Sequence, residues 1–296
     1  MTVKIEIPVI YHTSKHCHSL LEIWHIVNQK LDTSLDLTID FQKCSFLSHL
    51  GVAFLGGLSH HVRLQGGQLN FDWDTLQPKV RTNLAQNGFL FNFDEGSEPW
   101  SGNSVPYRQD LDQNKCAIIE YMLDRWLGKN WVDISLGLKS AIAGNVWEIY
   151  ANAFEHSNSS LGVFSCGQHY PKQKELHLTI VDFGQGIANN VRSLPQNRSL
   201  DASQALKWAF QTGNSTAIKT ISRGIGLSTL QNFVSTNRGN LKIFSNDGYV
   251  NIKDNKVIYE KRTINFQGTL INIAFKCDES FYCLASEVNN RVKQRF

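Results

Sequence analysis

The sequence predicts an α/β protein, an α+β sandwich made of two joined units. Over residues 1–95, apolar strands with a period of two alternate with helical runs, which is typical of strands joined by crossover helices. A stretch rich in Gly, Ser and Pro, 94–107, interrupts this pattern, and helices and apolar strands resume after it. We therefore expect one unit over 1–95, a linker at 96–107, a second unit over 108–280 and a C-terminal tail at 281–296.

The composition is that of an ordinary globular chain. Of the 296 residues, 42% are hydrophobic and 19% are charged, and the net charge of +3 gives no electrostatic case for binding nucleic acid. No window approaches the roughly 20 apolar residues of a membrane helix, and the start lacks the apolar run of a signal peptide. The six cysteines are scattered, which favours reduced thiols over disulfides or a zinc site. We expect a cytoplasmic protein without membrane contact.

The first unit begins with a strand within residues 1–11, because Ile5, Ile7 and Val9 alternate with polar residues. The glycine pair Gly66-Gly67 is a stop signal for a later helix. A strand, helix, strand, helix order predicts parallel strands with crossovers. The expected elements after the first strand are helix 20–31, strand 35–47, helix 49–64, strand 68–73, helix 76–86 and strand 89–93.

Several metal-ligating residue types gather near the N-terminus. Four histidines and one cysteine lie within fourteen residues: His12, His16, Cys17, His18 and His25. These side chains suit a metal ion, but no acidic or Cys/His cluster elsewhere in the sequence supplies a matching spacing. A polar turn followed by a helix face is the preferred interpretation.

The joint between strand 35–47 and helix 49–64 reads Phe-Leu-Ser-His-Leu-Gly and ends at Gly51. With the strand and helix order, this joint resembles the STAS domain, the anti-sigma-factor antagonist fold, over roughly residues 1–95. The family's joint typically reads Asp-Ser-Ser-Gly, and its second serine can be phosphorylated. Leu50 stands at that position here and cannot accept phosphate. Ser48 is better placed as the N-cap of the following helix.

The second unit opens with an amphipathic helix from Lys115 to Leu127, and a helix at 139–157 follows it. Strand 178–181 then leads into Asp182. The segment 187–221 that follows is polar, and polar segments of this kind can close over a bound ligand as a lid. The remaining expected elements are helix 202–210 within that segment, a helix after Gly226, strands 241–245, 249–252, 256–260 and 268–275, and hairpin turns at 246–248 and 253–255.

The helix at 139–157 carries a polar pair beside its apolar side. Glu148 and Asn152 are one turn apart and project together. An amide oxygen can ligate a hard cation such as Mg²⁺, and a carboxylate can orient or deprotonate a nucleophile. The pair therefore suits a metal–nucleotide site. The apolar side is formed by residues at spacings of three and four: Ile142, Val146, Ile149 and Ala153.

Three further blocks follow this helix at characteristic separations. Residues 176–187 place Asp-Phe-Gly-Gln-Gly after a strand, residues 222–230 place Gly-Ile-Gly before a helix, and residues 266–275 place Gly-Thr before an apolar strand. As a set, the four blocks resemble the GHKL ATP-binding superfamily of gyrase, the large heat-shock chaperone, MutL proteins, histidine kinases and anti-sigma-factor serine kinases. The resemblance covers roughly residues 105–276 and implies a Bergerat-type mixed sheet backed by helices.

The resemblance implies ATP and Mg²⁺ as ligands. Glu148 matches the general base of the superfamily, and Asn152 matches the ligand of Mg²⁺. Histidine kinases usually carry Asn at the position of Glu148, so hydrolysis or serine phosphorylation is favoured over phosphohistidine chemistry. No P-loop motif is present.

The other blocks would hold the nucleotide. Asp182 would accept a hydrogen bond from the adenine amine, and Thr269 would support Asp182 through water. A glycine turn at a helix N-terminus would bind the phosphates. The full set of implied nucleotide-binding residues is Asn152, Asp182, Gly184, Gly186, Ile187, Arg223, Gly224, Ile225, Gly226, Leu227 and Thr269.

The sequence therefore predicts a Mg²⁺-dependent ATP-binding protein, a slow ATPase used as a regulatory or conformational switch. Two alternatives remain: a serine/threonine protein kinase of the anti-sigma-factor type, and a non-catalytic module in which ATP maintains a partner-binding shape. A STAS-like unit fused to a kinase-like unit implies protein partners in a signalling pathway by analogy of fold alone, and a homodimer is left open.

Overall fold

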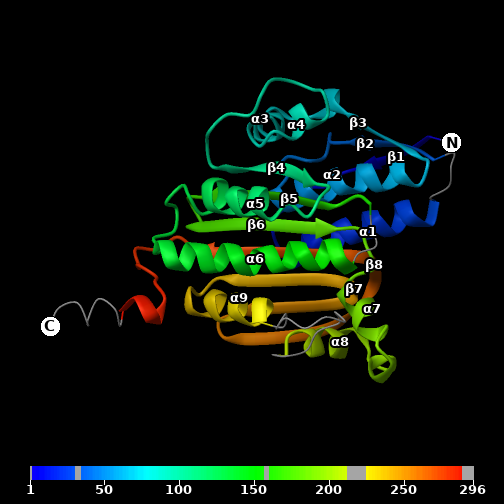
Figure 1. Cartoon of the computed structure of the whole chain (residues 1–296). Coiled ribbons are helices and arrows are strands. Elements are labelled where there is room, and N and C mark those ends of the chain that lie inside the picture. The colour runs from blue at the N-terminus through cyan, green and yellow to red at the C-terminus, as the bar shows by residue number, and fades with distance from the viewer. Residues whose placement is uncertain (1, 31–34, 157–159, 212–224, 289–296) are drawn as a thin grey trace.

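Two sheets and the helices around them form the molecule. Figure 1 shows the computed structural model, which describes residues 2–30, 35–156, 160–211 and 225–288. The smaller sheet has the strand order β1-β2-β3, and the larger one has the order β4-β5-β6-β8-β7. The chain is therefore of mixed α and β structure, as the sequence predicts.

The smaller sheet is parallel, which confirms the parallel arrangement predicted for these strands from the sequence. Its strands are β1 (Thr2–Glu6), β2 (Asp36–Asp40) and β3 (Gln68–Asp72). Ile5, Ile39 and Phe71 are neighbours across the three strands. The elements that connect and follow them are α1 (Ser14–Lys30), α2 (His49–Leu64), the 3₁₀ turn Trp73–Thr75 and α3 (Pro78–Gln86).

The strand predicted at 89–93 is wrong, because this segment forms the short helix α4 (Phe89–Asn92). The helix starts after Gly88, whose φ of 80° favours glycine, and the Asn87 side chain accepts a hydrogen bond from the Phe89 amide at 2.9 Å. Phe89 and Leu90 are adjacent and both buried. A short apolar run has no period that separates a strand from a helical turn, so the sequence could not decide between them.

The larger sheet is antiparallel throughout, so the predicted mixed sheet is wrong. Two hairpins, β5 to β6 and β7 to β8, join strands that are neighbours in the sheet, and a tight turn permits only the antiparallel arrangement. Residues 104–107, which the sequence places in the linker, are the first residues of β4. The strands are β4 (Ser104–Asp110), β5 (Val163–Tyr170), β6 (Glu175–Asp182), β7 (Asn240–Lys253) and β8 (Lys256–Lys276).

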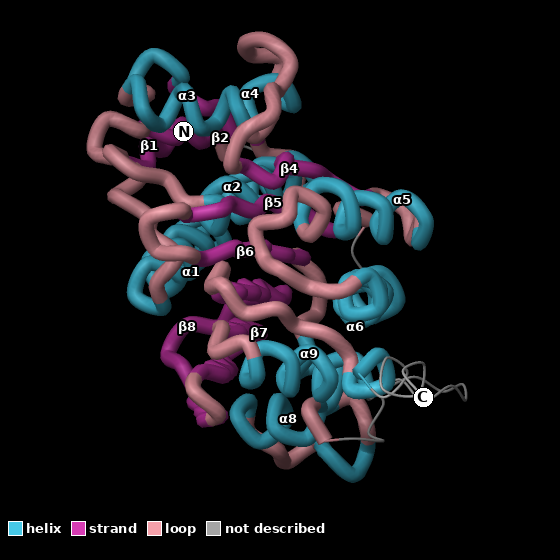
Figure 2. Tube along the Cα trace, turned by 90° about the vertical axis from the view of Figure 1, so that its left-hand side faces the viewer, coloured by secondary structure: helices cyan, strands magenta, loops and turns pink. Residues whose placement is uncertain are grey.

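Helices cover both faces of the larger sheet. Figure 2 shows α1 and α2 on one face and α5, α6 and α9 on the other. In the part of the tail that is described, Tyr282 pairs with Ile134. The helices of the second unit are α5 (Lys115–Glu120), its π-helical continuation Tyr121–Trp126, α6 (Leu136–His156), α7 (Ile187–Arg192), the 3₁₀ turn Pro195–Asn197, α8 (Ala202–Ala209) and α9 (Ile225–Thr236).

Helix α2 lies between the two sheets and is buried on nearly every side. A helix in this position is expected to be largely apolar, and residues 50–58 of α2 are all apolar or glycine. Two glycines let it approach its neighbours: a Cβ at Gly56 would lie 2.3 Å from the Tyr107 hydroxyl, and one at Gly57 would lie 2.2 Å from the Phe183 ring. One hydrophobic core consequently contains residues from both sides of the predicted linker.

The two predicted turns in the last hairpin have different outcomes. The turn at 253–255 is confirmed, and Asp254 and Asn255 both have positive φ, as a tight two-residue turn requires. The turn at 246–248 is wrong, because Asn246 lies within β7 as an irregularity in its pairing with β8. Asn, Asp and Gly are common in β-bulges as well as in tight turns, so the segment Asn-Asp-Gly does not distinguish the two structures.

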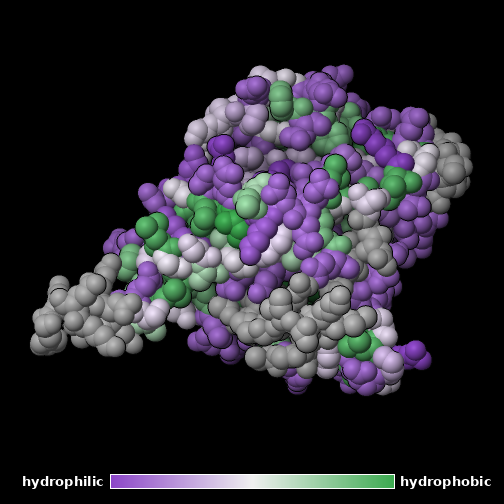
Figure 3. Space-filling view, viewed as in Figure 1, coloured by the Kyte–Doolittle hydropathy of each residue, from purple (hydrophilic) through white to green (hydrophobic). Residues whose placement is uncertain are grey.

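The surface carries polar residues over most of the face shown in Figure 3, with apolar residues in small groups. Within the described ranges, no helix combines the length and the apolar character needed to cross a lipid bilayer.

Candidate functional site

The centre of the candidate site is a row of three polar side chains on adjacent strands. Asp182 at the end of β6 is paired with Thr269 of β8, and Thr269 is paired with Ser245 of β7. All three are buried, and the hydroxyl oxygens of Ser245 and Thr269 share a hydrogen bond of 3.1 Å. The row therefore places one carboxylate and two hydroxyls side by side at one end of the sheet.

This row lies on the sheet face that α6 covers. Leu178 and Ile180 of β6 belong to the same hydrophobic cluster as Val146 of α6. Because strand side chains alternate between faces, Asp182 continues the line of Leu178 and Ile180. Asp182 lies at the same end of the sheet as the last residue of β4, because β5 pairs with both strands there. Just beyond β4, Gln113 donates to Glu155 near the end of α6 at 3.2 Å, so α6 also ends at this edge.

Burial dominates the electrostatics of Asp182. Removal from water raises the pKa of this carboxyl to about 7 from an ordinary 3.8. The Gly184 amide donates to Asp182 Oδ1 at 2.9 Å, and this bond and the contact with Thr269 offset part of the pKa rise. A buried carboxyl that titrates near neutral pH is costly to maintain, and such groups concentrate at functional sites.

The loop after Asp182 is held by β7. Gly186 has a φ of 80°, and a Cβ there would lie 2.5 Å from the Asn246 side-chain oxygen. Asn246 accepts from the Asn189 amide at 3.0 Å and donates to the Gln185 carbonyl at 2.8 Å. The Ile187 amide, at the start of α7, donates to Ser245 Oγ at 2.6 Å. The loop that carries Gly184 and Gly186 is thus fixed against the polar row.

Helix α6 supplies the predicted polar pair. Glu148 and Asn152 are both half-buried, one turn apart. The side chains predicted to face the core, Ile142, Val146 and Ile149, are buried in the cluster with β6. The helix period that places Glu148 and Asn152 at the border of the packed side is therefore confirmed.

Part of the predicted site falls outside the described residues. These are Arg223 and Gly224, together with residues 212–221 of the expected lid. Ile225, Gly226 and Leu227 form the first turn of α9, which packs beside α6 and β7. Within the described ranges, the structure brings together Asp182, Gly184, Gly186, Ile187 and Thr269.

Two members of the site were missed by sequence reasoning, Ser245 and Asn246. Ser245 shares its row with Thr269, and Asn246 anchors the loop from Gln185 to Asn189. The only signal was the interruption of apolar alternation at Ser-Asn-Asp-Gly, and that signal also fits a turn. Strand pairing decides between the two, and it is not visible in a local stretch.

Replacement of Asp182 by Asn is expected to stabilise the protein, and by more at pH 8 than at pH 5. The folded-state pKa of about 7 lies above the unfolded value of 3.8. Between these values the folded state binds a proton that the unfolded state has lost, so stability falls as pH rises and the loss is complete above about pH 7. The full difference amounts to about 4 kcal/mol. Urea denaturation of both proteins from pH 4 to pH 8 measures it, and a pH-independent difference would contradict the raised pKa.

Comparisons with known proteins add no family to this description. No protein-family model matches the sequence, and a search of curated proteins finds no match.

Proposed function

We propose that the chain binds Mg²⁺-ATP at the polar row and hydrolyses it slowly as a regulatory switch. The observation that carries this proposal is Asp182, a buried carboxylate at a strand end, aligned with Thr269 and Ser245 and followed by a glycine loop that a neighbouring strand holds in place. Buried polar groups that converge at one end of a sheet are what a ligand site requires.

The residues fit an adenine nucleotide. One Asp182 oxygen accepts from the Gly184 amide, and the carboxylate can accept a further bond from the exocyclic amine of adenine. Guanine has an oxygen at that position, which the carboxylate repels. Burial makes such a bond stronger than it would be in water. This pairing would favour ATP over GTP.

The pair on α6 fits the phosphate end. Asn152 offers an amide oxygen to Mg²⁺, which commonly takes few protein ligands and keeps several waters. Mg²⁺, when bound, neutralises phosphate charge. Glu148, one turn earlier on the same half-buried side, would accept the proton of the attacking water. The chain's own contribution is to position that water and to receive its proton.

Replacement of Glu148 by Gln is expected to leave Mg²⁺-ATP affinity within about threefold and to lower phosphate release by at least about 100-fold, the usual contribution of a general base. Calorimetry measures the affinity, with GTP as the nucleotide control, and γ-labelled ATP measures the release. Glu120→Gln on α5, an exposed site, is the matched control and should change neither quantity.

The same labelling experiment separates the alternatives. Label in free phosphate supports hydrolysis, label on a serine or threonine of an added protein supports a kinase, and binding with neither supports a non-catalytic module. Failure of the wild-type chain to bind Mg²⁺-ATP at millimolar concentration would overturn the proposed function.

A further inference from the structure

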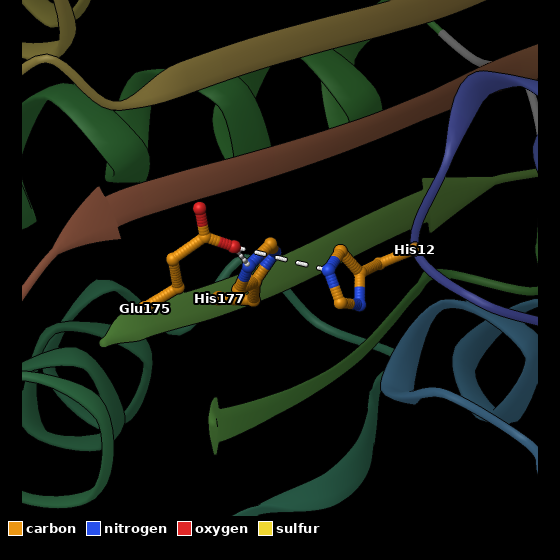
Figure 4. Close-up of side chains that lie close together, drawn as sticks. All are labelled: His12, Glu175 and His177. Carbon is orange, nitrogen blue, oxygen red and sulfur yellow. Dashed lines mark hydrogen bonds and ion pairs between the residues drawn. The ribbon is translucent and has the colours of Figure 1, made fainter. Parts of the chain in front are cut away.

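A second polar cluster lies on the opposite face of the larger sheet, where the first unit packs against it. Figure 4 shows His12, Glu175 and His177 close together. His12 precedes α1, whereas Glu175 and His177 lie on the same side of β6 because they are two residues apart. The cluster therefore joins segments more than 160 residues apart in sequence.

We propose that His12, Glu175 and His177 form a binding site for a divalent transition-metal ion of the Zn²⁺ class, which links the N-terminal segment to the central strand β6. This site is independent of the nucleotide site proposed above. Two imidazoles and one carboxylate are a ligand set that Zn²⁺ uses in proteins, with water completing the coordination.

The distances suit this assignment. Bonds of about 2.1 Å in a tetrahedral site place ligand atoms about 3.4 Å apart. Glu175 Oε2 lies 3.0 Å from His177 Nε2 and 3.8 Å from His12 Nε2, and one ligand atom from each residue lies within 4.8 Å of the others. The two separations from Glu175 Oε2 are therefore within about half an ångström of the tetrahedral value, and the two histidine nitrogens lie within 4.8 Å of each other.

The surroundings orient the three side chains. Lys276 binds the other oxygen of Glu175 at 2.6 Å, which leaves Oε2 facing the histidines. Lys242 donates to the His12 backbone oxygen at 3.0 Å and fixes the loop. Nε2 of His12 lies 3.8 Å from Glu175 Oε2, so this nitrogen is the ring atom placed to bind a metal ion together with Glu175.

His49, next to the cluster, is not a ligand. Its two ring nitrogens bond the Tyr170 hydroxyl and the Asn272 side-chain oxygen, both at 2.9 Å.

Two features limit the affinity. Lys242 and Lys276 bring positive charge close to the cluster. The Nδ1 atoms of His12 and His177 are buried without a partner among the described residues, whereas tight zinc sites provide an acceptor there. We therefore expect a dissociation constant on the order of micromolar rather than the tighter values of sites with a complete second shell.

The test is titration of the full chain, freed of metal by a chelator, with Zn²⁺ or Co²⁺ alone. We expect one equivalent to bind, tetrahedral Co²⁺ absorption to appear, and the melting temperature to rise by roughly 5 °C at a hundredfold excess over the dissociation constant. His12→Ala and Glu175→Gln should each weaken binding by at least 100-fold, because loss of an outer-shell partner alone costs 10- to 100-fold.

His25→Ala is the matched control, since His25 is an exposed residue of α1 outside the cluster. Circular dichroism in the presence of chelator verifies that each variant is folded. Absence of a stoichiometric site in the wild-type chain overturns the proposal. Equal binding by folded His12→Ala protein also overturns it, since the metal would then be held elsewhere.

Discussion

Replacement of Asp182 by Asn is expected to weaken ATP binding on the order of 100-fold while the protein remains folded. The Gly184 amide donates to Asp182 Oδ1. In the Asp182→Asn variant the side-chain oxygen would still accept from the Gly184 amide. The side-chain NH₂ group would then face the exocyclic amine of adenine, and both of these groups are hydrogen-bond donors. A buried donor left without an acceptor costs about 1–3 kcal/mol, and the lost acceptor adds to this cost. Calorimetric titration with Mg²⁺-ATP measures the change.

Asp40→Asn is a matched control for this variant. Asp40 also ends a strand, β2, and its Oδ1 also accepts from a backbone amide two residues later, that of Gln42, at 2.6 Å. It belongs to the other sheet, so its replacement should leave ATP affinity unchanged. If folded Asp182→Asn protein bound Mg²⁺-ATP with the affinity of the wild type, the Asp182 carboxylate would not be the group that binds adenine.

Replacement of Trp24 by Ala is expected to remove about 3–5 kcal/mol of stability, which is a large share of the total for a globular domain. Trp24 of α1 is 1% exposed, and its ring centroid lies 5.6 Å from that of Phe183 and 5.3 Å from that of Phe266. Both phenylalanines belong to the second unit. The cavity would therefore open at the packing between the units, and we expect one cooperative unfolding transition, shifted as a whole.

Urea denaturation followed by circular dichroism measures this loss. Trp100→Ala is the control, because Trp100 is 46% exposed and its truncation should change the free energy of unfolding by less than about 0.5 kcal/mol. Two separate transitions, of which Trp24→Ala shifts only one, would contradict the idea that the units share one core.

The elements with a clear local signal were predicted well. The helix at 49–64 was placed at its observed bounds, because the glycine pair after it ends the helix and the segment before that pair is rich in small and apolar residues. The parallel order of the first three strands followed from the helices between them. The strand at 89–93 and the turn at 246–248 failed because a short apolar run and an Asn-Asp-Gly segment each fit two local structures.

The candidate site was only partly accessible to sequence reasoning. Asp182, Gly184 and Thr269 could be named because the sequence blocks that contain them resemble the motifs of an ATP-binding family. Their neighbour Ser245 could not be named, since its place beside Thr269 depends on the register between β7 and β8. A shift of one residue would move the entire row to the other face.

The sequence by itself determined the long helices with a clear period, such as α2 and α6, and that Glu148 and Asn152 lie one turn apart on α6. These properties depend on a period within one segment. Only the tertiary structure decided that Asp182, Thr269 and Ser245 form one row and that α2 packs between the two sheets. It also decided that His12 lies close to Glu175 and His177. A period tells which side of an element faces inward, but the partner on that side is set by strand register and packing between segments far apart in the chain.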